Sequence, residues 1–76
     1  MTWDAEVDAA GLLCPLPVLK ARKRLLLMAP GQVLRLVATD AMAVVDVPHF
    51  CAEAGHAVLS DEETPSGHVW LIRRGP

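Results

Sequence analysis

A cysteine stands directly before two closely spaced prolines in the stretch GLLCPLPVLKARKRLLLM, which runs from Gly11 to Met28. Pro15 and Pro17 fall where a helical pattern of apolar residues begins. The first four backbone N–H groups of a helix have no partner inside it, so prolines at its first and third positions remove donors that form no helical bond. The spacing therefore predicts that Cys14 is the N-cap of a helix whose start the two prolines hold rigid.

A thiol at a helix N-terminus is suited to nucleophilic chemistry. The helix dipole favours negative charge at this end, and cysteines there have a pKa below the ordinary value of about 8.5. The thiolate is the form that attacks sulfur. The alternative is that Cys14 is a small buried apolar side chain and that the prolines merely begin a helix. We favour a reactive cysteine, because a nucleophile that enters another protein's active site gains from rigid display and a packing residue does not.

The remaining cysteine and the histidines give weaker signals. Cys51 has the helical spacing of a core residue, which favours packing over a role as a second, resolving thiol. Among His49, His56 and His68, only His49 has a close metal-ligand spacing, to Cys51, and these two residues point to different sides of a helix. We therefore expect no metal site.

Length and charge limit the class of protein. Seventy-six residues, 53% hydrophobic and 21% charged, make one domain over residues 1–76, with more apolar side chains than a core this small can hide. Some of them are expected to face a partner. The net charge of -2 and the three aromatic residues argue against direct nucleic-acid binding. We expect a cytoplasmic protein without a membrane partner, because there is no long apolar run and no signal-peptide pattern.

Basic residues cluster in the predicted first helix. Lys20, Lys23 and Arg24 share one arc, which Leu16 and Leu27 interrupt. Such an arc is commonly a solvated helix face, but apolar and basic residues beside a reactive thiol also suit docking onto an acidic partner. The expected partner-binding residues are Leu13, Leu16, Lys20, Lys23, Arg24 and Leu27.

Periodicity predicts the elements that position these residues. Alternating residues predict a strand over 3–8, and helical spacing predicts a helix over 15–28. The expected inner arc of that helix is Val18, Ala21, Leu25 and Met28, extended by Leu19 and Leu26. A Val- and Leu-rich run predicts a second strand over 32–39.

The second half of the chain adds a helix and two strands. Pro48 is tolerated only near a helix start, so Asp46 is the expected N-cap and Gly55 the expected end. The expected inward residues of this helix are Phe50, Cys51 and Ala54. Strands are predicted over 57–60 and 69–73, with Trp3 and Trp70 each supplying a large share of the core.

The predicted order of elements is βαβαββ. It indicates an α+β fold, a two-layer α/β sandwich with two helices packed on one face of a four-stranded mixed sheet. The first two strands are expected to be parallel, because the helix between them makes a right-handed crossover.

Several motifs together resemble the TusA (SirA-like) sulfur carrier family. The pattern D-x-x-G-L-x-C-P-x-P is reproduced by Asp8, Gly11, Leu12, Cys14, Pro15 and Pro17. Further matches are Asp40, the Asp46-Val47-Pro48 segment with Phe50, the Gly55-His56 pair and the terminal Leu71-Ile72-Arg73. The resemblance covers nearly the whole chain and implies the same βαβαββ sandwich. The chain differs from many members at Ala10 and Leu13, where one position often holds arginine, and at Leu16, where a polar residue is common.

The resemblance implies a sulfur relay centred on Cys14, with Asp8, Gly11, Leu12, Pro15 and Pro17 as supporting motif residues. In this family the motif cysteine accepts a persulfide sulfur from a cysteine desulfurase or rhodanese-like donor and passes it to a downstream acceptor thiol. The sulfur serves tRNA 2-thiouridine synthesis in characterised members and other sulfur-transfer pathways in relatives.

The expected role is that of a sulfurtransferase component that needs no cofactor and acts only with partner proteins. Two alternatives remain open at this point. The chain can be a non-catalytic regulatory or binding adaptor, or a redox protein that uses Cys14 and Cys51 as a pair.

Overall fold

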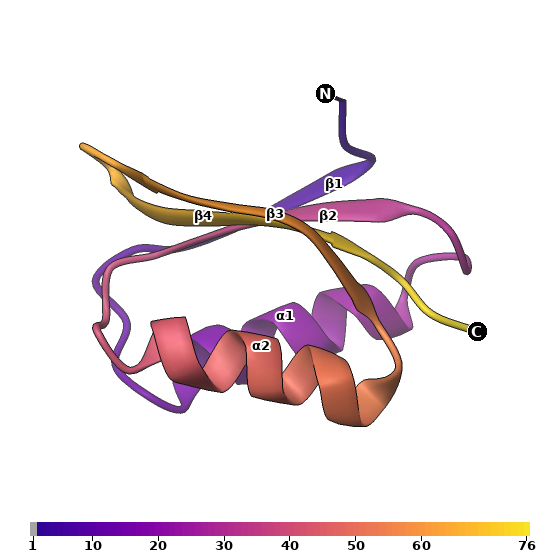
Figure 1. Cartoon of the computed structure of the whole chain (residues 1–76), viewed down its shortest axis with the longest axis horizontal. Coiled ribbons are helices and arrows are strands. Elements are labelled where there is room, and N and C mark those ends of the chain that lie inside the picture. Colours follow the sequence, from indigo (N-terminus) through magenta and orange to yellow (C-terminus); the bar gives the residue numbers. More distant parts are fainter. Residues whose placement is uncertain (1) are drawn as a thin grey trace.

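The computed structural model describes residues 2–76 and has the predicted order of elements (Figure 1). They are β1 (Ala5–Ala9), α1 (Leu16–Leu26), β2 (Val33–Ala38), α2 (Ala43–Ala54), β3 (Ala57–Thr64) and β4 (Gly67–Arg73). The strand order is β1-β2-β4-β3, with β1 and β2 parallel and the other neighbours antiparallel. Both helices cover the same face of the sheet (Figure 1). The predicted α+β two-layer sandwich is confirmed.

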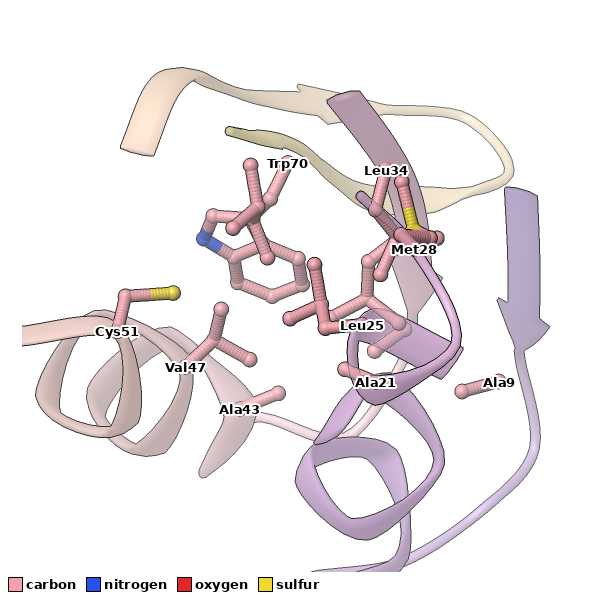
Figure 2. Packing of buried hydrophobic residues seen from close by; sticks show 12 residues of the cluster. Ala9, Ala21, Leu25, Met28, Leu34, Ala43, Val47, Cys51 and Trp70 are labelled. Carbon is pink, nitrogen blue, oxygen red and sulfur yellow. The ribbon is translucent and has the colours of Figure 1, made fainter. Parts of the chain in front are cut away.

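The core lies between the helices and the sheet and is built around Trp70, which is 1% exposed, as predicted (Figure 2). Every element except β3 contributes fully buried side chains to it, among them Ala9, Ala21, Leu25, Leu34, Leu36, Val47 and Ile72. Cys51 is also 1% exposed, and its sulfur points toward the Trp70 indole (Figure 2). The prediction that Cys51 is a packing residue is confirmed.

The prediction that Trp3 shares the core is wrong. The chain bends at Asp4, whose backbone N–H donates to the Val33 carbonyl and whose carboxylate accepts from the Val33 N–H, each at 2.8 Å. Trp3 is therefore outside β1 and 44% exposed, and its ring lies 5.1 Å from the Arg35 guanidinium. Alternation alone does not reveal this bend, because Trp3 has the same parity as the inward residues of the strand.

Three residues that the sequence places inward are exposed. Leu19 and Leu26 of α1 and Ala54 of α2 face water, whereas Ala21 and Leu25 are buried. A two-layer sandwich buries only one stripe of each helix, since the opposite side has no further layer above it. The apolar arc of α1 is therefore wider than the stripe that packs.

Helix α2 begins earlier than predicted. It starts at Ala43, so Asp46 lies in its first turn instead of at the N-cap, and Pro48 lies inside the helix. Ala43 and Val47 are both buried against the core, one helical turn apart. This tertiary packing stabilises the first turn more than the local proline signal disfavours it. The Asp46 side chain is consequently not a cap and projects from the helix.

The β3–β4 hairpin is longer than predicted. The sequence suggests a turn over 61–68, but β3 continues through Thr64 and β4 begins at Gly67. The acidic residues of this stretch pair with β4 through their backbone. Because β3 is an edge strand, its charged side chains stay in water while the backbone pairs.

Among the described residues, no helix is long and apolar enough to cross a membrane.

Candidate functional site

Cys14 belongs to the loop between β1 and α1. This loop lies at the end of the sheet where the parallel strands β1 and β2 lead into their helices (Figure 1). Parallel strands release both connections at the same edge, so the loop before α1 meets the loop before α2. Two carboxylates hold the cysteine, one from the loop before α2 and one from the first turn of α2. The Cys14 backbone N–H donates to Asp40 Oδ2 at 2.6 Å, and the Cys14 thiol donates to Asp46 Oδ2 at 2.8 Å.

The motif residues before the cysteine shape its loop. Asp8 Oδ1 accepts a hydrogen bond from the Ala10 N–H at 3.0 Å. The Gly11 N–H donates to Thr39 Oγ1 at 2.8 Å, which ties this loop to the second connection. Gly11 has a φ of 82°, a conformation that glycine adopts without steric strain. Asp8 and Gly11 therefore act on the backbone path toward Cys14 and not on its sulfur.

Leu12 and the two prolines complete the support of the loop. The Leu12 side chain packs against the core, and its N–H donates to the Ala9 carbonyl at 3.1 Å. Pro17 is buried at the start of α1, where a missing N–H loses no helical bond. The Cys14–Pro15 peptide bond is cis. These contacts anchor the chain on both sides of the cysteine.

The N-cap of α1 is Pro15, so the predictions that Cys14 caps the helix and that Pro15 is its first residue are wrong. The Leu16 N–H, which would face the sulfur if Cys14 were the N-cap, donates to the Leu13 carbonyl at 2.9 Å. The thiol points instead to Asp46. Tertiary contact with the second connection thus replaces the expected local interaction with the helix start.

The pKa of the Cys14 thiol is raised above its ordinary value, which contradicts the predicted lowering. The hydrogen bond to Asp46 is the main cause, followed by partial removal from water and by the negative charges of Asp46 and Asp40. A neighbouring carboxylate favours the protonated thiol over the thiolate. At rest, therefore, Cys14 is held as a thiol.

The two cysteines occupy opposite environments. Both are free, Cys14 exposed and Cys51 buried. Burial raises the pKa of the Cys51 thiol to about 11. Cys14 lies in a shallow depression lined by Pro15, Pro17, Val18, Asp40, Ala43 and Asp46. Only Cys14 is presented to a partner, since the Cys51 sulfur faces the core (Figure 2).

Four exposed apolar residues, which we call the apolar collar, lie within two sequence positions of Cys14, Asp40 or Asp46. They are Leu13, Leu16, Met42 and Val45, with Leu13 70% and Val45 62% exposed. The first two are neighbours of Cys14 in sequence, and the other two are neighbours of Asp40 and Asp46. Sequence reasoning identified Leu13 and Leu16 but missed Met42 and Val45. The predicted parallel pairing of the first two strands could have revealed them, because it brings the loop before α1 next to the loop before α2.

The other expected partner-binding residues lie farther along α1. Lys20, Lys23, Arg24 and Leu27 line a hollow of about 310 Å³ together with Glu6, Val7 and Asp8 of β1. Helical spacing places Leu16, Lys20, Lys23 and Leu27 on one outward face of α1. Leu16, Lys20, Lys23 and Leu27 therefore form a strip along α1 that begins two residues after Cys14, and Arg24 lines the same hollow as Lys20, Lys23 and Leu27.

The histidines have structural partners. His49 contacts Glu53 at 3.1 Å, and His68 contacts Asp61 at 3.3 Å and Glu63 at 3.2 Å. His56 Nδ1 accepts the Gly75 N–H at 2.9 Å. Across residues 2–76, no three side chains of His, Cys, Asp or Glu are grouped to hold a metal ion.

Comparison with known proteins shows the family to which the chain is similar. The family model described as "Sulfurtransferase TusA" matches residues 5–74. A "Sulfur carrier protein TusA" of Allochromatium vinosum is 40% identical over 72 residues, 95% of this chain and 95% of the relative. Another, from Pseudomonas entomophila, is 39% identical over 71 residues, 93% of this chain and 89% of the relative.

The fold has a solved counterpart. The crystal structure of a SirA-like protein from Desulfitobacterium hafniense has a TM-score of 0.81, is 23% identical, and corresponds to 96% of this chain and 100% of its own. The family match runs from the first residue of β1 to just beyond β4 and includes both connections that form the cysteine site. The chain therefore belongs to the TusA family of sulfurtransferases.

Proposed function

We propose that this protein carries sulfur as a persulfide on Cys14. It takes the sulfur from a cysteine desulfurase or rhodanese-like donor and passes it to the thiol of a downstream relay protein. One observation carries the proposal: within a TusA-family chain, the motif cysteine is exposed, with its backbone held by Asp40 and its sulfur held by Asp46. The other motif residues support the loop and leave the sulfur free to react.

The chemistry is an exchange of one S–S bond for another. The Cys14 sulfur attacks the outer sulfur of the donor persulfide, and the donor cysteine leaves as a thiolate. In the second half, an acceptor thiolate attacks the outer sulfur of the Cys14 persulfide, and Cys14 is released. No external oxidant or reductant is consumed, and the protein supplies positioning without a cofactor. It acts as a component of a sulfurtransferase system and turns over only with its partners.

Docking is attributed to the strip on α1. The apolar collar excludes water around the reacting sulfurs, while Lys20 and Lys23 attract an acidic partner surface. Donor and acceptor must each approach Cys14, so they use this surface in turn. We place the relay in the cytoplasm, where thiols stay reduced, with tRNA 2-thiouridine synthesis as one destination of the sulfur.

Intact-mass measurement tests the proposal. The protein is incubated with a cysteine desulfurase and cysteine, alongside Cys14→Ser and Cys51→Ala variants. Wild type and Cys51→Ala are expected to gain about 32 Da, the mass of one sulfur atom, and Cys14→Ser to gain nothing. Absence of the adduct with desulfurase and rhodanese-like donors alike would favour a binding adaptor. A loss of two hydrogens that needs both cysteines would identify a redox protein.

A further inference from the structure

The carboxylate of Asp46 lies in direct contact with the sulfur that reacts. Its Oδ2 atom is 2.8 Å from Cys14 Sγ, and the thiol is the donor of this hydrogen bond. The contact joins two helices, since Cys14 precedes α1 and Asp46 lies in the first turn of α2. A hydrogen bond of this length is within the reach expected of a general base and the proton that it removes.

Asp40 has a different function in the same site. Its Oδ2 atom accepts the Cys14 backbone N–H at 2.6 Å, so it fixes the main chain and does not contact the thiol. Asp46 is the carboxylate that accepts the S–H proton. The two acidic residues therefore divide the work between positioning the backbone and contacting the sulfur.

The local charges leave the proton on sulfur until it is taken away. The charged groups that act on Cys14 are Asp46 of α2 and Asp40 of the preceding loop, and both favour the protonated form. The histidines, which are the usual proton acceptors near neutral pH, are bonded elsewhere: His49 to Glu53, His68 to Asp61 and Glu63, and His56 to Gly75. A protonated thiol is a poor nucleophile, so transfer needs a base at hand.

We propose that Asp46 is the general base that takes the Cys14 proton as sulfur is transferred. This inference rests on the proposed carrier function and assigns a catalytic residue to it. The proton moves from Sγ to Asp46 Oδ2 while Sγ bonds to the outer sulfur of the donor persulfide. The donor's S–S bond breaks, and its inner sulfur leaves as a thiolate. The proton then passes from Asp46 to that thiolate, so the products are the Cys14 persulfide and a neutral donor thiol.

Asp46 would thus have opposite effects on two reactions of the same sulfur. It lowers the thiolate population, which slows attack on a simple alkylating agent, and it accelerates a persulfide exchange by accepting the proton. An electrostatic role alone would slow both reactions. The comparison of alkylation with sulfur acceptance therefore separates a base from a suppressing charge.

The experiment compares wild type with Asp46→Asn, which keeps a hydrogen-bond acceptor but cannot take the proton. Alkylation by iodoacetamide and sulfur acceptance from glutathione persulfide are timed by intact mass at neutral pH. The small donor removes any effect of protein docking. We expect Asp46→Asn to alkylate faster than wild type and to accept sulfur more slowly than wild type, by about 100-fold or more. Asp46→Glu, which restores a carboxylate, is expected to recover part of the acceptance rate.

Glu53→Gln is the matched control. It removes one carboxylate from the exposed surface of α2, where Glu53 contacts His49, and both rates should remain at the wild-type value. Asp46→Ala provides a second variant without a base, and far-UV circular dichroism checks that each variant is folded.

Two results would overturn the assignment. If Asp46→Asn and Asp46→Ala accelerate alkylation and acceptance together, Asp46 only suppresses the thiolate. If both variants accept sulfur at the wild-type rate, Asp46 is not needed for the step. Failure of wild type to accept sulfur on Cys14 from any donor would instead refute the carrier function.

Discussion

At the scale of single residues, the site combines exposure with low intrinsic reactivity. Cys14 is accessible, yet its sulfur donates to Asp46 and keeps its proton because of that contact. A surface thiol of this kind reacts slowly with small oxidants and alkylating agents, since both reactions depend on the thiolate. In the proposed relay, activation depends on the approach of the sulfur donor and on the Asp46 carboxylate.

The pH profile of alkylation tests this state. The raised pKa of Cys14 means that its thiolate forms at higher pH than that of an ordinary cysteine. The iodoacetamide rate should therefore rise with a midpoint above that of free cysteine, and Asp46→Asn should shift the midpoint downward. A wild-type midpoint below that of free cysteine would contradict the observed hydrogen bond.

Cys51 provides the internal comparison. It is buried beside Trp70, so it should stay unmodified in the folded protein and react only after denaturant is added. Peptide mapping after alkylation, with and without urea, distinguishes the two cysteines. Equal protection of both in the folded protein would mean that Cys14 is not available to partners.

At the scale of elements, periodicity predicts the order βαβαββ, because each element has an inner face toward a single core. The site is less predictable. The hydrogen bond from Cys14 to Asp46 joins the loop before α1 to the first turn of α2, and the local sequence pattern of each segment contains no information on the distance between them. Helix α2 shows the same limit, since burial of Ala43 and Val47 extends it past the start that Pro48 suggests. Topology, not local sequence, brings Asp40 and Asp46 to the cysteine.

Gly67, at the start of β4, allows a prediction about stability. Gly67 has a φ of 128°, and a Cβ there would lie 2.8 Å from the Ala38 backbone oxygen. Gly67→Ala should lower the free energy of unfolding by about 1–3 kcal/mol, from backbone strain and displacement of β2. Gly31→Ala is the control for strain alone, because its φ of 88° is also positive but the space around it is open. Urea unfolding should show the larger loss for Gly67→Ala, and equal losses would mean that the clash is relieved.

At the scale of the whole molecule, the C-terminal segment ties the helical layer together at the end away from the cysteine site (Figure 1). Arg74 Nε donates to the Leu25 carbonyl at 2.7 Å, and the Gly75 N–H donates to His56 Nδ1. The ends of both helices are thus held by one short stretch of chain. This C-terminal clasp, formed by Arg74 and Gly75, stabilises one end of the molecule, and the other end presents the exposed Cys14 thiol.

His56 makes the clasp sensitive to acid. Removal from water and the Arg74 charge lower the pKa of His56, so the unfolded chain binds its proton more readily than the folded one. The contribution of His56 to the free energy of unfolding is therefore fully present above its pKa in the unfolded chain, about 6.5. This contribution is lost as the pH falls through the pKa of His56 in the folded protein. Urea unfolding at pH 7.5 and 5.5, about one unit either side of that value, should show this loss in wild type and a smaller one in His56→Asn. His49→Gln controls for a histidine at the exposed surface and should keep the full loss.

Charge on the helical face gives a prediction about association. Lys20→Glu together with Lys23→Glu should slow binding to an acidic sulfur donor by about tenfold at low salt, with a smaller effect at high salt. Arg73→Glu changes the charge of an exposed residue in β4, away from the α1 strip, and should leave the rate unchanged. Surface plasmon resonance at two ionic strengths measures both. Equal slowing by the Arg73 change would indicate a general charge effect without a defined surface.

The apolar collar has a consequence for the choice of partner proteins. Leu13 and Leu16 lie at the start of α1, Met42 and Val45 lie at the start of α2, and the Cys14 thiol donates to Asp46 instead of to any of these four residues. In the proposed relay, partner recognition and sulfur chemistry therefore belong to separate side chains. Exchange of these four residues is expected to change the choice of partner and to leave the chemistry at the Cys14 sulfur unchanged.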